Sequence, residues 1–279
     1  MPQNIVFSPE IITSRANPLL VKVGKLEDKK HRDADKIFRF DGIKLFCEAI
    51  KCGAEIEYVF VRESAKDRVV SSLETHPEIA GYPGRSGRFI LLGDSAFDKI
   101  SPEKSPEGII CVAKYVDNFK KTDKIEGKDV KGKAIVVESV RDPGNLGTIL
   151  RCADAFGIDH VILSSDCADV FSPKTLRGAM GAVFRKSITV CSDLCATVTE
   201  LKEDGRRVLA TALHRDSLKL GDFDLNPTDV FVIGNEGHGI SDGLITACGE
   251  TVFIPMCGGA ESLNAGVAAS ICMWELSKL

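Results

Sequence analysis

The segment AIVVESVRDPGNLGTILRCADAFG, residues 134–157, decides the fold class of the C-terminal half. It opens with an apolar run suited to a strand that is buried on both faces. After a short glycine-containing loop, apolar residues recur at helical spacing from Leu146 to Ala153. A buried strand, a tight loop and an amphipathic helix form one unit of a parallel α/β sheet. We expect Asn145 to cap this helix.

The same alternation of strand and helix continues to the C-terminus, through the apolar runs HVILSS, SITVC, RVLATAL, VFVIGN and TVFIPM. This pattern predicts a parallel sheet covered by helices on both faces. Upstream, EIEYVFVRE, RFILLG and GIICVAKYV predict the strands of a smaller α/β domain. The polar, lysine-rich run between the halves predicts a solvated linker. The expected organisation is therefore a domain over 1–116, a linker over 117–131 and a second domain over 132–279.

Composition restricts the class of protein. The 279 residues are 44% hydrophobic and 27% charged, as in an ordinary folded protein, and the net charge of -4 argues against one that coats nucleic acid by bulk electrostatics. The stretch from Arg15 to Lys44 is an exception, with nine Lys or Arg against five acids. The ten cysteines contain no CxxC pair, and no apolar run approaches the ~18 residues of a membrane span. We expect reduced thiols, a cytoplasmic location, no metal site and no membrane contact.

Three glycine-rich loops follow three strands of the second half: RDPGNLGTILR, GNEGHGIS and CGGAESLNAG. Open α/β sheets bind ligands at the carboxyl ends of their strands, so the three loops predict a ligand site lined by backbone. The order Gly-x-x-Gly-x-Gly in the second loop differs from the dinucleotide fingerprint, and the chain has no phosphate-binding loop of the ATPase type. A conventional NAD or ATP site is therefore disfavoured.

Arg151 is the first candidate for chemistry. Helical side chains lean toward the helix start, so the absence of a side chain at Gly147 would let Arg151 reach the free N–H groups there. Those groups and the helix dipole favour an anion such as an RNA phosphate. The alternative is a surface ion pair between Arg151 and Asp154, which is worth a few tenths of a kcal/mol.

Polar residues of the other two loops also have two interpretations. Glu236, between glycines, is either a ligand-facing carboxylate or a solvated turn residue. Ser262 and Asn264 precede the terminal helix, where they either face the ligand or cap the helix, and one side chain can do both. His238 is more simply a solvated loop histidine than a general base.

The motifs NLGTILRCADAFG, VIGNEGHGIS and IPMCGGAESLNAGVAASI, in this order, resemble the three signatures of the SpoU branch of the SPOUT methyltransferases over roughly residues 132–279. The text ITSRANPLLVKVGKLEDKKHR and FRFDGIKLFCEAI is similar to the family's substrate-binding domain, which is related to ribosomal RNA-binding proteins. The resemblance implies S-adenosylmethionine as methyl donor, a ribose 2′-hydroxyl of RNA as acceptor, a trefoil knot in the C-terminal domain, and a homodimer.

The resemblance also assigns roles to residues of this chain. The catalytic set would be Asn145, Arg151, Glu236, Ser262 and Asn264. The donor pocket would be lined by Thr211, Leu213, Gly234, Ile254, Met256 and Leu263. The locally basic N-terminal segment suggests RNA contacts from Arg15, Asn17, Lys22, Lys25 and Arg32.

The sequence thus predicts a ribose 2′-O-methyltransferase, and its N-terminal domain favours ribosomal RNA over transfer RNA as the substrate. Two alternatives stay open. One is a non-catalytic RNA-binding or ribosome-assembly factor with the same fold. The other is a SPOUT transferase that modifies transfer RNA or a base nitrogen.

Overall fold

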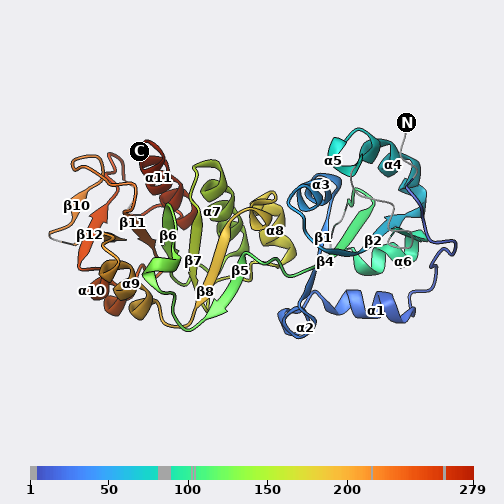
Figure 1. Cartoon of the computed structure of the whole chain (residues 1–279), viewed down its shortest axis with the longest axis horizontal. Helices are drawn as coiled ribbons and strands as arrows, with labels where there is room; N and C mark the ends of the chain where they lie inside the picture. The colour runs from blue at the N-terminus through green and yellow to red at the C-terminus, as the bar shows by residue number, and fades with distance from the viewer. Residues whose placement is uncertain (1–4, 81–88, 102, 104, 215, 260–261) are drawn as a thin grey trace. The chain divides into compact units, whose positions relative to one another are not determined.

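The computed structural model describes residues 5–80, 89–101, 103, 105–214, 216–259 and 262–279. The chain divides into two compact units (Figure 1). Unit 1 consists of Met1–Val116 with Phe171–Arg177, and unit 2 of Asp117–Val170 with Gly178–Leu279. The expected domain limits, which placed all of 132–279 in the second domain, differ from these units at Phe171–Arg177. Buried Phe171 stacks on Tyr115, with ring centroids 4.2 Å apart.

Unit 1 is built on a four-stranded mixed sheet in the order β1-β4-β2-β3. β4 pairs antiparallel with β1 and β2, and β2 pairs parallel with β3. The strands are β1 (Ile37–Asp41), β2 (Ile56–Arg62), β3 (Phe89–Leu92) and β4 (Ile109–Lys114). The helices are α1 (Pro18–Lys25), α2 (Lys29–Asp35), α3 (Ile43–Lys51), η1 (Glu63–Ala65), α4 (Lys66–Glu74), α5 (Pro77–Ala80) and α6 (Asp94–Ile100). This confirms the expected small α/β unit.

Unit 2 is built on an eight-stranded sheet in the order β10-β12-β9-β11-β6-β7-β8-β5, in which every pair is parallel. The strands are β5 (Phe119–Thr122), β6 (Ala134–Val137), β7 (His160–Ser164), β8 (Ser187–Cys191), β9 (Val208–Thr211), β10 (Leu218–Lys219), β11 (Val230–Ile233) and β12 (Glu250–Phe253). The parallel sheet predicted from the alternating pattern is confirmed. Because all strands run the same way, their carboxyl ends share one edge.

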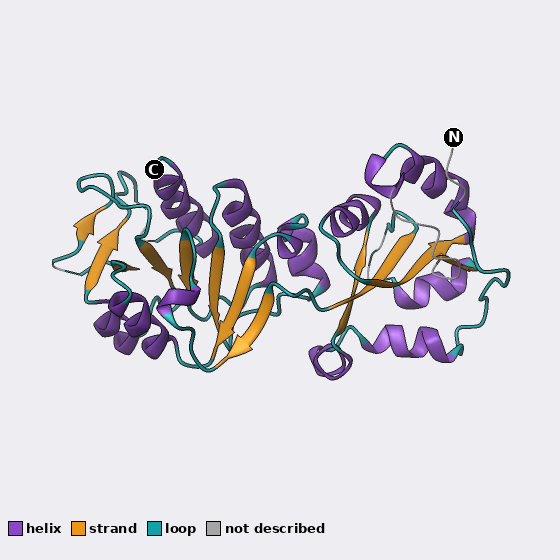
Figure 2. Ribbon diagram, in the orientation of Figure 1, coloured by secondary structure: helices purple, strands orange, loops and turns teal. Residues whose placement is uncertain are grey.

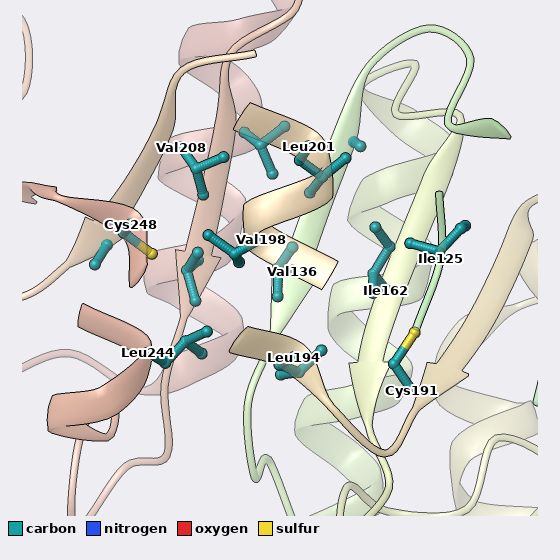
Figure 3. Close-up of a cluster of buried hydrophobic side chains, with 14 of the residues drawn as sticks. Ile125, Val136, Ile162, Cys191, Leu194, Val198, Leu201, Val208, Leu244 and Cys248 are labelled. Carbon is teal, nitrogen blue, oxygen red and sulfur yellow. The ribbon is translucent and has the colours of Figure 1, made fainter. Parts of the chain in front are cut away.

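Helices cover both faces of this sheet (Figure 2). α7 (Pro143–Ala155) packs against α11 (Ala265–Ser277), and α9 (Leu194–Glu203) packs against α10 (Asp242–Cys248). The remaining helical segments are η2 (Gly127–Asp129), α8 (Pro173–Ala179) and η3 (Ala182–Phe184). Figure 3 shows α9 in front of the strands, with side chains such as Val198 and Leu201 meeting Val136 and Ile162 in one buried cluster. Each such buried side chain contributes roughly 1.5–3 kcal/mol.

The expected linker 117–131 contains secondary structure. Its residues form β5, which pairs with β8 in the register Phe119↔Ile188, and the 3-10 turn η2. β5 is the last strand in the order of the sheet. The exposed Lys120 and Lys121 are compatible with this edge position, where lysines also discourage aggregation. The lysine-rich composition therefore marked an edge strand as well as a solvated surface.

All ten cysteines are free thiols. Within the described ranges no helix is long and apolar enough to cross a bilayer. Over the same ranges no three His, Cys, Asp or Glu side chains converge as a metal site.

Candidate active site at the carboxyl edge of the large sheet

The site begins with the start of α7, which differs from the expectation. Asp142 is the N-cap, and its carboxylate accepts hydrogen bonds from the backbone N–H of Gly144 (2.8 Å) and Asn145 (2.9 Å). Pro143 occupies the first helical position, where its missing N–H costs nothing. The cap expected at Asn145 is therefore wrong, and the Asn145 side chain, within the first turn, points to other loops.

Three side chains from three loops form a hydrogen-bonded series that we call the polar chain: Glu236, Asn145 and Asn264. Asn145 Nδ2 donates to Glu236 Oε1, and Asn264 Nδ2 donates to Asn145 Oδ1 at 2.9 Å. Asn264 Oδ1 accepts from the N–H of Gly266 (3.0 Å) and so caps α11 as well. The polar chain brings together residues up to 119 positions apart. The Asn264 side chain therefore caps α11 and at the same time bonds to a residue of another loop of the site.

The loop after β11 is a closed turn that only glycine permits at its first position. A Cβ on Gly234 would lie 2.4 Å from the carbonyl carbon of Gly239. Asn235 and Gly239 exchange backbone hydrogen bonds, and Asn235 Oδ1 accepts from the N–H of Gly237 at 2.8 Å. Asn235 Nδ2 donates to the carbonyl of Ser139 at 2.7 Å. Sequence reasoning missed Asn235, although an Asn followed by Glu-Gly is a turn signal.

Glu138, at the end of β6, was also missed. Its carboxylate accepts two hydrogen bonds from Ser241, one from the backbone N–H and one from Oγ, each at 2.7 Å. This clamp fixes the chain that leaves the 234–239 turn and enters α10. An acidic residue directly after a buried strand was the available signal.

A cavity of about 440 Å³ opens beside the polar chain. All six residues expected around the methyl donor line it: Thr211, Leu213, Gly234, Ile254, Met256 and Leu263. Glu236 and Ser262 line it too. Its size suits a cofactor of a few tens of atoms, and Leu213 and Met256 offer apolar surface, with Leu213 77% exposed. These apolar walls, together with the backbone of Gly234 and its neighbours in the lining, fit an adenosine-containing ligand.

Arg151 is exposed on α7 and forms no hydrogen bond or ion pair within the described part of the chain. The alternative partner, Asp154, is bound instead by Arg185 at 2.8 Å. Gly147 does not serve the expected purpose, because it is buried and the backbone of α8 packs on it. A Cβ on Gly178 would lie 3.1 Å from the Gly147 Cα, so close contact between α7 and α8 explains the pair of glycines.

The five expected RNA-binding residues of unit 1 have different environments. Arg15, Lys22 and Lys25 are exposed, and Lys22 pairs with Asp35 at 3.1 Å. Asn17 caps α1 by accepting from the N–H of Leu19 at 2.9 Å.

Arg32 does not belong with the exposed cations. It is 2% exposed and donates to the carbonyls of Leu26 (2.5 Å) and Glu27 (2.6 Å). The sequence showed only a charge in a basic stretch, whereas the fold uses this charge to satisfy carbonyls at the end of α1.

Both halves of the chain match known protein families. Residues 132–274 match the SpoU rRNA Methylase family, and residues 17–111 match the MRM3-like substrate binding domain. The chain belongs to the SpoU rRNA methylase family. It is therefore a methyltransferase, and its large parallel sheet has the SPOUT fold.

Similar members of the SpoU family have been named and solved. The 23S rRNA (guanosine(2553)-2′-O)-methyltransferase RlmP of Bacillus subtilis is 32% identical over 95% of this chain and 98% of the relative. The 23S rRNA (guanosine-2′-O-)-methyltransferase RlmB of Coxiella burnetii is 28% identical over 79% of this chain and 86% of its own. The AdoMet-bound rRNA methyltransferase of Sinorhizobium meliloti superposes with a TM-score of 0.77 at 28% identity, covering 96% and 97% of the two chains.

Proposed function

We propose that this SpoU-family protein transfers a methyl group from S-adenosylmethionine to the 2′-hydroxyl of one ribose in ribosomal RNA. The polar chain Glu236–Asn145–Asn264 beside a glycine-lined cavity carries this proposal. A non-catalytic RNA-binding factor would have no need to hold three polar side chains from distant loops in register. The names of the relatives from B. subtilis and C. burnetii support ribose over a base nitrogen.

S-adenosylmethionine supplies an activated methyl group when bound. Gly234, Ile254 and Leu263 would hold the adenosine part largely through backbone groups, and Leu213 and Met256 would cover the adenine face. The N-termini of α7 and α11 face the same edge of the sheet, so their free N–H groups and dipoles favour the negative groups of RNA there.

Arg151 would orient an RNA phosphate and stabilise the negative charge that develops on the 2′-oxygen. An arginine guanidinium keeps its positive charge in proteins, so this side chain is suited to hold a negative group and poorly suited to remove a proton. Preorganised positive charge at the reacting oxygen is instead a large source of rate enhancement.

Glu236 is our candidate for accepting the proton that leaves the 2′-hydroxyl as the oxygen–methyl bond forms. One of its oxygens accepts from Asn145, which fixes the carboxylate, and within the described residues the other oxygen has no donor. A phosphate oxygen of the RNA is the competing acceptor. Ser262, on the wall of the same cavity, would help to position the reacting groups.

Unit 1 would bind the RNA around the target. The match to a substrate-binding domain and the exposed cations Arg15, Lys22 and Lys25 support this role, since such cations attract phosphates independently of sequence. Asn17, which caps α1, would hold this basic segment in shape. We propose a cytoplasmic location for a protein that acts on ribosomal RNA.

We also propose a knotted C-terminal domain and a homodimer formed through α11. Trp274 is 52% exposed and Val267 is exposed on the same helix, which is an unusual amount of apolar surface for a solvated face. Trp274→Glu should convert a dimer to a monomer in light scattering, and an unchanged mass would contradict this interface.

Methyl transfer to ribosomal RNA tests the proposed function. Purified protein, S-adenosylmethionine and unmethylated ribosomal RNA should yield a 2′-O-methylated nucleoside when the product RNA is digested and analysed by mass spectrometry. A methylated base would favour the base-nitrogen alternative. Absence of donor binding in calorimetry would favour the non-catalytic alternative.

A further inference from the structure

A second polar cluster lies next to the polar chain, where β6 and β7 end. It consists of Ser139, Arg141, Ser164 and Asp166. The Asp166 carboxylate accepts from Ser164 Oγ (2.6 Å), Ser139 Oγ (2.7 Å) and an Arg141 amino group (3.0 Å). Ser164 Oγ also accepts from the backbone N–H of Ser139 at 2.8 Å. Asp166 therefore links the loop after β6 to the loop after β7 through hydrogen bonds.

Backbone strain at Ser139 suggests that this loop shape serves a purpose. Its φ is +55°, in the left-handed region that costs a non-glycine residue roughly 1–2 kcal/mol. Three side-chain hydrogen bonds hold Ser139 there, two with Ser164 and Asp166 and one from Asn235 to its carbonyl. Strained residues that persist in this way concentrate at functional sites. Through Asn235, the cluster is joined to the turn that carries Glu236.

Arg141 is the part of the cluster that faces solvent. Its side chain is 70% exposed, although one amino group is held on Asp166. A guanidinium has five N–H donors in a planar fork, so the Asp166 contact leaves others available. An exposed ion pair contributes only about 0–1 kcal/mol to stability, so folding alone gives little reason to hold this arginine in place.

Asp166 is suited to act as a permanent anchor. Burial opposes its ionisation, but the hydrogen bonds from Ser164, Ser139 and Arg141 outweigh burial and lower its pKa to about 2. The carboxylate is thus ionised throughout the range in which cells operate. Arg141 is held at every working pH.

Strand order gives the position of Arg141 along the edge. The sheet runs β12-β9-β11-β6-β7, so residues after β12, β9 and β11 surround the donor cavity, and residues after β11 and β6 supply Glu236 and Asn145. Arg141 and Asp166 follow β6 and β7 and come next on the same edge. An RNA strand whose acceptor ribose lies at Glu236 and Asn145, and which continues along the edge, meets Arg141.

We propose that Arg141, held by Asp166, is a positioning residue that binds an RNA phosphate flanking the acceptor nucleotide. This inference rests on the proposed RNA substrate. The guanidinium is presented in a fixed orientation, so little side-chain entropy is lost when the phosphate binds, and a planar fork can engage two phosphate oxygens.

The chain offers a matched control in Arg185. It is also ion-paired, to Asp154 at 2.8 Å, but it follows η3 and contacts the last turn of α7, far from that helix's start. Both arginines bind a carboxylate in unit 2 and keep part of their side chains exposed, but of the two only Arg141 lies on the carboxyl edge.

The test measures binding of in vitro transcribed, unmethylated 23S ribosomal RNA and methyl transfer to it. Arg141→Ala should raise the KM for RNA about tenfold and leave the KM for the donor unchanged. It should also make the plot of log affinity against log salt concentration less steep by about 0.9, which is the value for one lost phosphate contact on a duplex. Arg141→Lys should restore part of the RNA affinity. Asp166→Asn should raise the KM for RNA by a smaller factor, and Arg185→Ala should change neither KM.

Equal behaviour of Arg141→Ala and Arg185→Ala would overturn the inference. So would an equal rise of both KM values in Arg141→Ala, because that would mean a structural role transmitted through Ser139 and Asn235. If wild-type protein transferred no methyl group, the proposed function would fail instead. RNA binding by filter retention would then still decide the role of Arg141.

Discussion

The two ends of the eight-stranded sheet differ in a way that identifies the functional site. The amino end has the larger cavity, about 980 Å³, and the carboxyl end the smaller, about 440 Å³. Beside the cavity at the amino end, charged groups pair with near neighbours in the chain, as Glu126 does with Lys128 at 2.5 Å. At the carboxyl end, side chains from three loops bond to one another and two helices begin. Convergence of loops and helix N-termini, and not volume, therefore marks the site.

The largest expected difference between the two ends is in the rate of methyl transfer after one asparagine at each end is replaced by alanine. Asn145→Ala removes the middle of the polar chain and should lower single-turnover methyl transfer by a factor on the order of 10²–10³, as loss of a preorganised polar group at a reacting centre does. The control is Asn118→Ala at the amino-end cavity, where Asn118 Nδ2 donates to the carbonyls of Val183 and Lys186. Asn118→Ala should lower thermal stability and leave the rate of methyl transfer unchanged. Similar rates for the two variants would remove the distinction between the ends.

Arg151→Lys tests the orientation role of the first-motif arginine. The charge remains but the planar fork is lost, so we expect kcat to fall by roughly 10- to 100-fold. Glu236→Gln keeps an oxygen that can accept from Asn145 but cannot take up a proton, so it should also lower kcat. A near-wild-type rate in Arg151→Lys would refute the orientation role.

Gly234→Ala tests whether the turn after β11 holds the donor. The added Cβ would lie 2.4 Å from the Gly239 carbonyl carbon, so the turn must open and donor affinity should fall at least tenfold in calorimetry. Gly243→Ala on α10 is the control, because its Cβ would meet only the Cys195 Sγ at 3.9 Å. Unchanged donor affinity in Gly234→Ala would place the donor elsewhere.

The smallest expected effect is a loss of folding stability at acidic pH, caused by a histidine at the amino end of the sheet. His160 is buried, with Nε2 2.8 Å from Thr189 Oγ1, and burial together with Lys120 and Arg206 lowers its pKa to about 4. The unfolded chain protonates near 6.5, so stability from neutral His160 is complete above that pH and is lost as the pH falls toward 4.

Urea unfolding at pH 7.5 and pH 4.5, followed by the fluorescence of Trp274, measures this loss. The loss of unfolding free energy that is due to His160 should be at most roughly 3 kcal/mol, so the total loss should be smaller in His160→Gln. Methyl transfer by this variant at pH 7.5 should equal that of the wild type. An equal loss in the variant would show that His160 is not the responsible group.

The sequence was sufficient to predict the parallel sheet and the convergence of the three loops at one edge. Both predictions depend on local patterns, namely the alternation of strands with helices and the glycine-rich loops. Asn145 was wrongly predicted to be the N-cap of its helix, although the sequence held the correct signal. An Asp-Pro pair commonly starts a helix, and Asp142 is the N-cap. Asn235 lay in a loop already singled out and Glu138 in the segment 134–157, but their partners, Ser139 and Ser241, are 96 and 103 residues away.

Other misjudgements involved burial, which local sequence does not reveal. Arg32 lies in a basic stretch, but tertiary packing turns it inward to bind carbonyls. Gly147 was assigned to the reach of Arg151, whereas its near neighbour is Gly178, from a separate helix.

The most direct test of a ribose methyltransferase at the carboxyl edge is a nucleotide-resolution map of 2′-O-methylation in ribosomal RNA from a deletion strain. The account predicts that one ribose methylation is lost, that the wild-type gene restores it and that Asn145→Ala does not, while Asn118→Ala does. Restoration by Asn145→Ala, a missing base methylation, or an unchanged map would contradict it.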